Sequence, residues 1–168
     1  MTTAIHAAIV SRIDALADEL IAVSHAIHAQ PELAFKEHFA ASTLTQALRK
    51  HDLETKTLVI FCSDNGPAAP RGFAANGRLQ GKKGSMFEGG HRVPFFFHWP
   101  KKGINKAQDI NELTAHIDLL PTLTDACSLK VPAGAKFDGK SLMPLLTSPN
   151  VTWPERILVT EAKINSRS

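Results

Sequence analysis

The apolar run TLVIFC at residues 57–62 constrains the fold of this chain more than any other stretch. Its residues are mostly β-branched, aliphatic or aromatic and do not alternate with polar ones, which is typical of a strand covered on both faces in the middle of a parallel sheet. The run ends abruptly in Ser63-Asp64-Asn65-Gly66. In open α/β sheets, ligands bind where such strands end. The sequence therefore predicts an α/β fold with a candidate binding site at Asp64 and Asn65.

Length and charge narrow the classes of protein to consider. A chain of 168 residues with 43% hydrophobic residues is long enough for one domain with a real core. Its net charge of +3 is spread along the chain, whereas a nucleic-acid-binding face needs clustered basic residues. No apolar run approaches the roughly 20 residues of a membrane span, and no signal-peptide pattern is visible. We expect a cytoplasmic chain, as encoded, with neither nucleic acid nor membrane as partner.

The first third of the sequence has helical periodicity. Apolar residues recur at spacings of three and four from Thr3 to about Gln30, which predicts an amphipathic helix. A second helix is predicted at about 36–50, with Pro31 in the intervening turn or at a helical start. The pattern changes at residues 51–56. We therefore divide the chain into an αα-hairpin at 1–52 and an α/β region at 53–168.

The remaining elements are shorter. The sequence predicts a long loop at 67–81, a second strand at 93–98 and a final strand at 156–161. Between 109 and 129 it predicts a helix interrupted at Pro121, whose main part begins near Asp118. Residues 131–140 are expected to be loop, and residues 141–146 a short turn or helix.

Taken alone, Asp64-Asn65-Gly66 has two interpretations. Such a tripeptide is most often only a turn, because Asn and Gly tolerate positive φ and Asp binds its own backbone. However, a carboxylate and an amide oxygen are also hard ligands suited to Ca²⁺ or Mg²⁺. A lysine between glycines, in Gly81-Lys82-Lys83-Gly84, would balance an anion held on such a metal.

The histidines and cysteines give weaker indications. The N-terminal histidines lack an HExxH or comparable ligand pattern, so we interpret them as surface or packing residues. They are His6, His25, His28 and His38. Cys62 and Cys127 provide neither a disulfide framework nor a metal-binding spacing, and we expect both to be buried apolar thiols.

Four motifs in this order indicate a family: TLVIFCSDNG, GKKGSMFEGGHRVPFFFHWP, HIDLLPTLTDAC and DGKSLMPLL. Together, over roughly residues 56–161, they resemble the C-terminal half of the catalytic domain of type I sulfatases. That family has an alkaline-phosphatase-like α/β fold and hydrolyses sulfate esters. Its nucleophile is a formylglycine made from Cys or Ser in a C-x-P-S-R motif, beside a divalent cation that is usually Ca²⁺. The resemblance implies a partial sheet-and-helix domain of this type, preceded by the αα-hairpin.

The resemblance also assigns roles to residues. Asp64 and Asn65 match two of the family's metal ligands, for Ca²⁺ or Mg²⁺. Lys83 matches the lysine that contacts the sulfate, because the K-G-x-x-x-E-G-G pattern selects it over Lys82. Glu88 and Arg92, in contrast, belong to the structural frame of the motif.

Two residues of the third motif are interpreted structurally. We expect His116 to stand at the entry to a helix and Asp118 to cap that helix.

The sequence also departs from the family pattern. No C-x-P-S-R motif is present: Cys62 is followed by Ser-Asp-Asn and Cys127 by Ser-Leu-Lys, so neither is proposed as the nucleophile. The family's paired N-terminal aspartates are missing as well. Two hard ligands in place of six or more predict a weak cation site. We expect a sulfatase fragment that is inactive alone and binds a sulfate ester or another small anion. Members of the family that are intact sulfatases are often exported.

Two alternatives remain. The first is a non-catalytic binding or assembly module that self-associates through unpaired strand edges. The second rests on the segment 27–37, IHAQPELAFKE, which with its flanks at about 10–50 resembles the opening H-x-x-P-E-L-x-x-x-E helices of M20 metallopeptidases and amidohydrolases. That family's metal ligands have no match downstream, so an M20-type hydrolase fragment is the more remote alternative. Together, the two resemblances predict a chimeric chain.

Overall fold

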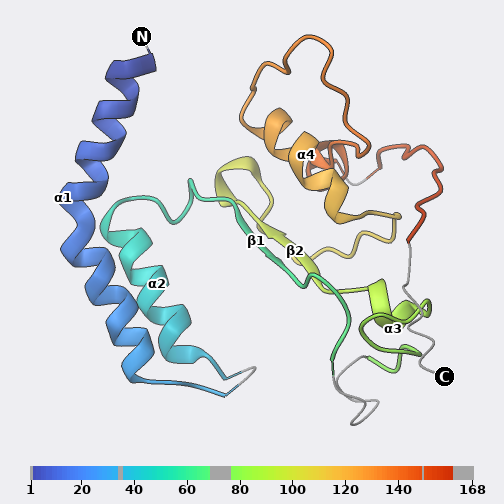
Figure 1. The fold of residues 1–168 in the computed structure, drawn as a ribbon, viewed down its shortest axis with the longest axis horizontal. Coiled ribbons are helices and arrows are strands. Elements are labelled where there is room, and N and C mark those ends of the chain that lie inside the picture. The colour runs from blue at the N-terminus through green and yellow to red at the C-terminus, as the bar shows by residue number, and fades with distance from the viewer. Residues whose placement is uncertain (1, 34–35, 69–76, 149, 161–168) are drawn as a thin grey trace, which may run out of the picture. The chain divides into compact units, whose positions relative to one another are not determined.

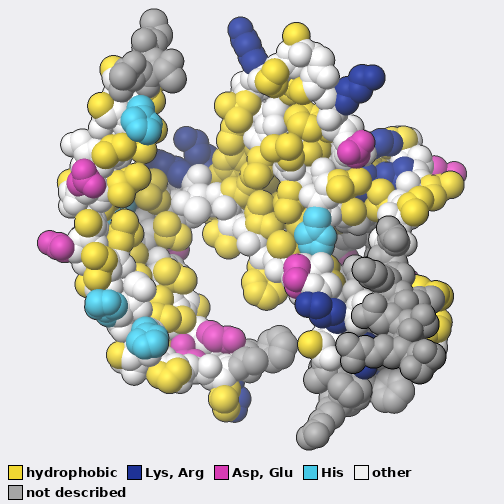
Figure 2. Space-filling view, in the orientation of Figure 1, with side chains coloured by type: hydrophobic (Ala, Val, Ile, Leu, Met, Phe, Trp, Pro, Cys, Tyr) yellow, Lys and Arg dark blue, Asp and Glu magenta, His cyan; other side chains and the backbone are white. Residues whose placement is uncertain are grey.

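The computed structural model describes residues 2–33, 36–68, 77–148 and 150–160 of the chain (Figure 1). The chain divides into two compact units, Met1–Thr57 and Leu58–Ser168. Figure 2 shows hydrophobic side chains along the helices of the first unit and gathered over the body of the second. Among the described residues, no helix combines the length and the apolar character needed to cross a membrane.

The first unit is the predicted helical hairpin. Helix α1 spans Thr2–Ala29 and contacts α2, which spans His38–Lys50, so both predicted helices are confirmed. Polar contacts join the two helices near the end of α2. The Glu19 carboxylate contacts Lys50 Nζ at 2.7 Å and His51 Nε2 at 3.0 Å. Hydrogen bonds from Lys50 and His51 lower the pKa of Glu19.

Glu32 caps the second helix from outside it. Its carboxylate accepts the backbone N–H groups of Phe39 at 2.8 Å and Ala40 at 2.9 Å, and these hydrogen bonds lower the pKa of Glu32. Both donors belong to the first turn of α2, where N–H groups have no partner within the helix and a negative charge is favoured. Glu37, which precedes the helix directly, makes no side-chain cap.

The second unit contains a two-stranded antiparallel sheet. Strand β1 spans Val59–Cys62 and strand β2 spans Phe95–His98. In their register, Phe61 lies opposite Phe96 and Cys62 opposite Phe95. The positions of both strands are as predicted, but the expected parallel sheet around β1 is wrong within the described residues, because β1 pairs only with the antiparallel β2.

The expected burial of the first strand on both faces is also wrong. Phe61 is 64% exposed and Phe96 63% exposed. These two side chains share one face of the sheet, because residues directly opposite each other in a register point the same way. Cys62 is exposed as well, and so is Cys127, which corrects the prediction of buried thiols. An apolar strand is buried only where other elements cover it, and its composition does not supply that cover.

Short helices complete the second unit. Helix α3 spans Glu88–His91, and 3₁₀ turns occupy Pro100–Lys102 (η2) and His116–Asp118 (η3). The η3 turn leads into α4, Leu119–Ala126, which packs against α5, Met143–Thr147. The predicted helix start near Asp118 is confirmed, whereas residues 109–115 are irregular rather than helical.

One buried region of this unit lies between α4 and α5. Leu142 and Leu145 are buried, and Thr122 is fully buried beside them. The Thr122 hydroxyl donates to the carbonyl oxygen of Asp118 at 2.6 Å and accepts the N–H of Leu142 at 2.8 Å. The Thr122 hydroxyl therefore has a partner both as donor and as acceptor, and it joins the start of α4 to the segment that leads into α5.

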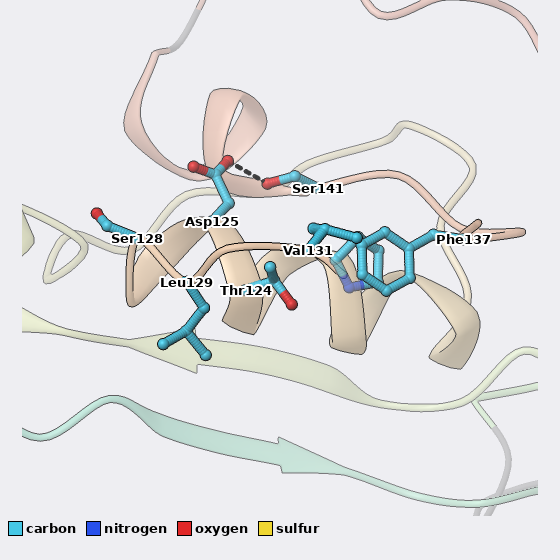
Figure 3. A pocket seen from close by; sticks show the side chains of 8 residues that line it. Thr124, Asp125, Ser128, Leu129, Val131, Phe137 and Ser141 are labelled. Carbon is cyan, nitrogen blue, oxygen red and sulfur yellow. Dashed lines mark hydrogen bonds between the residues drawn. The ribbon is translucent and has the colours of Figure 1, made fainter. Parts of the chain in front are cut away.

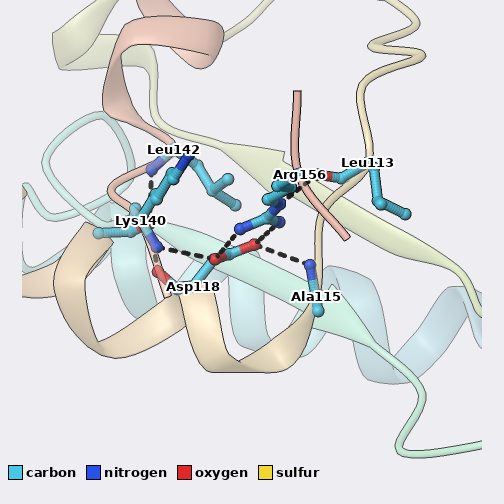
Figure 4. Close-up of polar contacts among 7 residues, drawn as sticks. Leu113, Ala115, Asp118, Lys140, Leu142 and Arg156 are labelled. Atoms are coloured by element: carbon cyan, nitrogen blue, oxygen red, sulfur yellow. Dashed lines mark hydrogen bonds and ion pairs between the residues drawn. The ribbon is translucent and has the colours of Figure 1, made fainter. Parts of the chain in front are cut away.

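Asp118 is the polar centre of the unit (Figure 4). It is fully buried, and its carboxylate binds the guanidinium of Arg156 through both oxygens, with Nη1 2.8 Å from Oδ1. It also accepts the N–H of Ala115 at 2.8 Å and of Lys140 at 2.9 Å, while Arg156 Nε donates to the carbonyl oxygen of Leu113 at 2.9 Å. The side chain closes η3 and does not cap α4, contrary to the prediction.

Arg156 holds a segment that was expected to be a strand. Residues 156–160 have no strand structure, and residue 161 lies outside the described residues. Ile157 is 90% exposed and Val159 is 92% exposed. The pattern gives these residues β propensity, but a strand forms only against a partner, and none of the described residues pairs with this segment.

We predict that Asp118→Asn destabilises the second unit by about 3 kcal/mol, because the change leaves the buried guanidinium of Arg156 without its counter-charge. Both tryptophans, Trp99 and Trp153, belong to this unit. Urea unfolding followed by tryptophan fluorescence therefore measures the relevant free energy of unfolding.

Asp125→Asn is the matched control. Asp125 is exposed and its carboxylate accepts a hydrogen bond from the Ser141 hydroxyl at 2.5 Å, so its substitution is expected to change stability by less than about 1 kcal/mol. Burial opposes ionisation of Asp118, but the hydrogen bonds from Arg156, Lys140 and Ala115 outweigh burial and lower its pKa. The contribution of Asp118 is thus complete above its ordinary pKa of 3.8 and declines as the pH falls below it. An equal loss in both variants at neutral pH would contradict this role.

Candidate metal and anion site

The turn that carries Asp64 and Asn65 follows β1 directly and is held through Ser63. The N–H of Ser63 donates to the carbonyl oxygen of Pro94 at 3.2 Å, and its hydroxyl donates to the carbonyl oxygen of Asn65 at 2.8 Å. A ring nitrogen of His116 lies 2.8 Å from the Ser63 carbonyl oxygen. Asp64 is exposed and Asn65 is half-buried. The structure thus offers a carboxylate to solvent at the end of the strand, beside a turn fixed by hydrogen bonds.

The loop at residues 81–85, which carries Lys82 and Lys83 and is called the lysine loop here, packs against this turn. The N–H of Gly66 donates to the carbonyl oxygen of Gly90 at 3.0 Å, and the N–H of Lys83 donates to the carbonyl oxygen of Pro67 at 3.0 Å. A Cβ atom on Gly66 would overlap the carbonyl oxygen of Gly89, so the approach requires glycine. The structure therefore brings the segment that follows Asn65 against the backbone of Lys83.

The loop has a compact internal structure. The N–H of Ser85 donates to the carbonyl oxygen of Lys82 at 2.9 Å, and the N–H of Lys82 donates to the Ser85 hydroxyl at 3.1 Å. Gly84, inside this turn, has a φ of +79°, which favours glycine. Lys82 and Lys83 are both exposed at its surface. Two ammonium groups are thus presented to solvent from a tight turn.

Glu88 and Arg92 form the adjacent ion pair. Arg92 Nη1 lies 3.4 Å from Glu88 Oε1, four residues earlier in the sequence; the Arg92 side chain is 65% exposed and that of Glu88 60% exposed. An exposed pair of this kind contributes little to stability. Their assignment to the structural frame of the motif stays a prediction.

The donors at the turn fit a hard cation in kind but not in number. Asp64 offers a carboxylate and Asn65 an amide oxygen, whereas Ca²⁺ takes six to eight oxygen ligands. Across residues 2–33, 36–68, 77–148 and 150–160, no group of three or more His, Cys, Asp or Glu side chains is arranged to hold a metal ion. Two donors are fewer than the six to eight that Ca²⁺ takes, and the assignment of Asp64 and Asn65 as metal ligands stays a prediction.

A separate open groove of about 510 Å³ lies beside α4 (Figure 3). The predicted site residues are not among those that line it. The lining residues are Pro121, Thr124, Asp125, Ser128, Leu129, Val131, Phe137 and Ser141.

Sequence reasoning missed the role of His116 beside the turn. It placed this residue only at the entry to a helix, which the η3 turn confirms. His116 and Ser63 are 53 positions apart, and their contact depends on how η3 lies against the end of β1. A short-range pattern carries no signal of such a contact.

Comparison with known proteins agrees with the motifs. The family profile described as Sulfatase matches residues 39–129, which is more than half of the chain. The chain belongs to the sulfatase family. The match includes Asp64, Asn65 and Lys83 and begins within α2, earlier than the predicted start near residue 56. It leaves the M20-like interpretation of residues 1–52 as a prediction.

Relatives of this sulfatase-family chain come from bacteria and animals. It is 31% identical over 117 residues to the uncharacterized sulfatase YdeN of Escherichia coli, covering 66% of this chain and 20% of that protein. It is 38% identical over 109 residues to human arylsulfatase A, covering 64% of this chain and 21% of that enzyme. The chain thus spans about one fifth of the length of these relatives.

A solved structure shows the same likeness. The crystal structure of Ps i-CgsB in complex with k-i-k-neocarrahexaose matches with a TM-score of 0.54 and 33% identity, covering 62% of this chain and 23% of that one. The fold is therefore a partial α/β domain of the sulfatase type, as expected.

We predict that Gly66→Ala separates the Asp64–Asn65 turn from the lysine loop, because the added methyl group overlaps the Gly89 carbonyl oxygen. The amide of Lys83 should then lose its protection from hydrogen exchange, since its bond to Pro67 requires the close approach. Exchange measured by NMR tests this expectation.

Gly84→Asn is the control for this change. Gly84 has open space around its Cα, and asparagine tolerates its positive φ. Protection of the Lys83 amide should survive in this variant. Unchanged exchange in Gly66→Ala would show that the contact does not hold the two segments together.

Proposed function

We propose that this chain carries half of a sulfate-ester site, which binds a divalent cation and a sulfate group but does not turn over the ester alone. Asp64 and Asn65 would hold the cation, Ca²⁺ or Mg²⁺, and Lys83 would contact the sulfate. The observation that carries the proposal is the pair of backbone hydrogen bonds, Gly66 to Gly90 and Lys83 to Pro67, that joins the turn to the lysine loop in a sulfatase-family chain.

The chemistry of these side chains supports the assignment. A carboxylate and an amide oxygen provide the hard donors that Ca²⁺ prefers, and a lysine ammonium is a point charge that suits a sulfate oxygen. Asp64 and Lys83 are exposed, so water and salt weaken both interactions. Binding is therefore expected to be weak and to fall as ionic strength rises.

The sequence supports the proposed lack of turnover. These 168 residues contain no C-x-P-S-R motif, so nothing supplies the family's formylglycine nucleophile. Cys62 and Cys127 are exposed but stand in other sequence contexts. The proposed ligand is thus a sulfate ester or another small anion that is bound and released unchanged.

We predict that Lys83→Ala weakens the binding of inorganic sulfate in the presence of Ca²⁺ about fivefold, because it removes the ammonium that contacts the anion. Lys82→Ala, from the same turn, should change the affinity by less than about twofold. Isothermal titration calorimetry at low ionic strength measures both, and Asp64→Ala should abolish the binding of Ca²⁺.

Three results would contradict the proposal. If Lys82→Ala and Lys83→Ala weaken sulfate binding equally, Lys83 is not the specific sulfate contact. If Asp64→Ala still binds Ca²⁺, Asp64 is not a ligand of the cation. Robust hydrolysis of an aryl sulfate that depends on Lys83 would overturn the claim that the chain does not turn over the ester.

The second candidate is a binding or assembly module, which the open face of the sheet favours. Val59, Phe61 and Phe96 are exposed on this face, and the rings of Phe61 and Phe96 lie 6.1 Å apart between centroids. An apolar face next to unpaired strand edges favours pairing with another chain. We propose self-association through this sheet as the alternative to an anion-binding function.

The oligomeric state tests the second candidate. The protein is expected to associate at concentrations of tens of micromolar, and the double variant Phe61→Lys, Phe96→Lys should remain monomeric because its charges resist burial. Leu33→Lys, at a 76% exposed position outside the sheet, is the control and should associate like the wild type. Light scattering coupled to size-exclusion chromatography measures the mass. A strictly monomeric wild type that unfolds cooperatively would exclude this candidate.

A further inference from the structure

We infer that His116 is a positioning residue for the Asp64–Asn65 turn. The inference rests on the proposed function, because the turn is the proposed cation site. The contact that motivates it is the 2.8 Å approach of His116 Nε2 to the Ser63 carbonyl oxygen. A carbonyl oxygen only accepts hydrogen bonds, so Nε2 carries the proton and donates it.

The bonded oxygen belongs to the peptide unit that leads into Asp64. A peptide unit is planar, and therefore a donor that fixes the Ser63 carbonyl also fixes the direction of the Asp64 N–H. The other groups of Ser63 are fixed as well: its N–H by Pro94 and its hydroxyl by Asn65. With His116 in place, rotation of the peptide that precedes the carboxylate is restricted. Such restriction lowers the entropy lost when a cation binds.

The imidazole ring is exposed but lies beside the aromatic side chains of β2. Its centroid lies 5.8 Å from that of the Phe95 ring, and the Phe95 ring lies 4.9 Å from that of Phe97. Phe95 belongs to β2, opposite Cys62 at the end of β1. The sheet that delivers the turn thus also supports the ring that fixes it.

The backbone of His116 is anchored by Asp118. His116 begins η3, which Asp118 closes through the N–H of Ala115, and Arg156 holds Asp118 in turn. A continuous series of contacts therefore runs from Arg156 through η3 to Ser63. Through this series, the segment around Arg156 contributes to the geometry of the Asp64–Asn65 turn, in addition to the contribution of the sheet.

The test compares His116→Ala with His116→Gln, whose side-chain amide retains a donor near the position of Nε2. His98→Ala is the matched control, because His98 is an exposed histidine on β2. The first readout is the set of NMR order parameters for the amides of Asp64, Asn65 and Gly66, which requires no metal. The second readout is the affinity for Ca²⁺ alone.

We expect His116→Ala to lower these order parameters from the rigid range near 0.85 toward 0.6 and to weaken Ca²⁺ binding about threefold to tenfold. His116→Gln should restore both, and His98→Ala should change neither. Unchanged order parameters in a folded His116→Ala protein would overturn the inference. So would a rapidly exchanging Nε2 proton in the wild type, a measurement that needs no variant. If the wild type binds no Ca²⁺, the proposed function fails, while the order parameters still decide the role of His116.

Discussion

The buried contact between Asp118 and Arg156 is the interaction on which the second unit depends. A fully buried carboxylate is tolerated only when its charge is balanced and its oxygens accept hydrogen bonds. Asp118 meets both conditions by binding the guanidinium of Arg156, the N–H of Lys140 from farther along the chain and the N–H of Ala115 in its own turn. The same carboxylate closes η3 through the N–H of Ala115 and holds the segment around Arg156. A single ionised side chain thus organises a unit that has few buried apolar residues.

The candidate site is a consequence of close backbone packing rather than of a deep cavity. Gly66 approaches Gly89 and Gly90 so closely that a side chain would not fit, and this approach brings the lysine loop to the end of β1. His116 then ties the turn to η3. The carboxylate of Asp64 and the ammonium groups of Lys82 and Lys83 remain in solvent, where water and salt weaken their interactions with ions.

Local patterns predicted local structure well. The helices of the first unit follow from apolar spacing, and the start of α4 follows from a proline placed where a missing N–H is harmless. The strand positions were also predictable from β-branched and aromatic residues. Their burial and direction were not, because both depend on which elements pack against the strand. Val59 and Phe61 are exposed for this reason, and Ile157 lies in a segment with which no strand of the described residues pairs.

The sequence by itself determined the chemical groups of the candidate site and their family: Asp64 and Asn65 at the end of a strand, Lys83 between glycines, and motifs shared with sulfatases. The tertiary structure alone decided that Gly66 packs on Gly89 and Gly90, that His116 donates to Ser63 and that Arg156 neutralises Asp118. The physical reason is distance along the chain. Dihedral preferences and periodic burial act over a few residues, whereas these contacts join positions separated by 20 to 50 residues or so and exist only once the chain has folded.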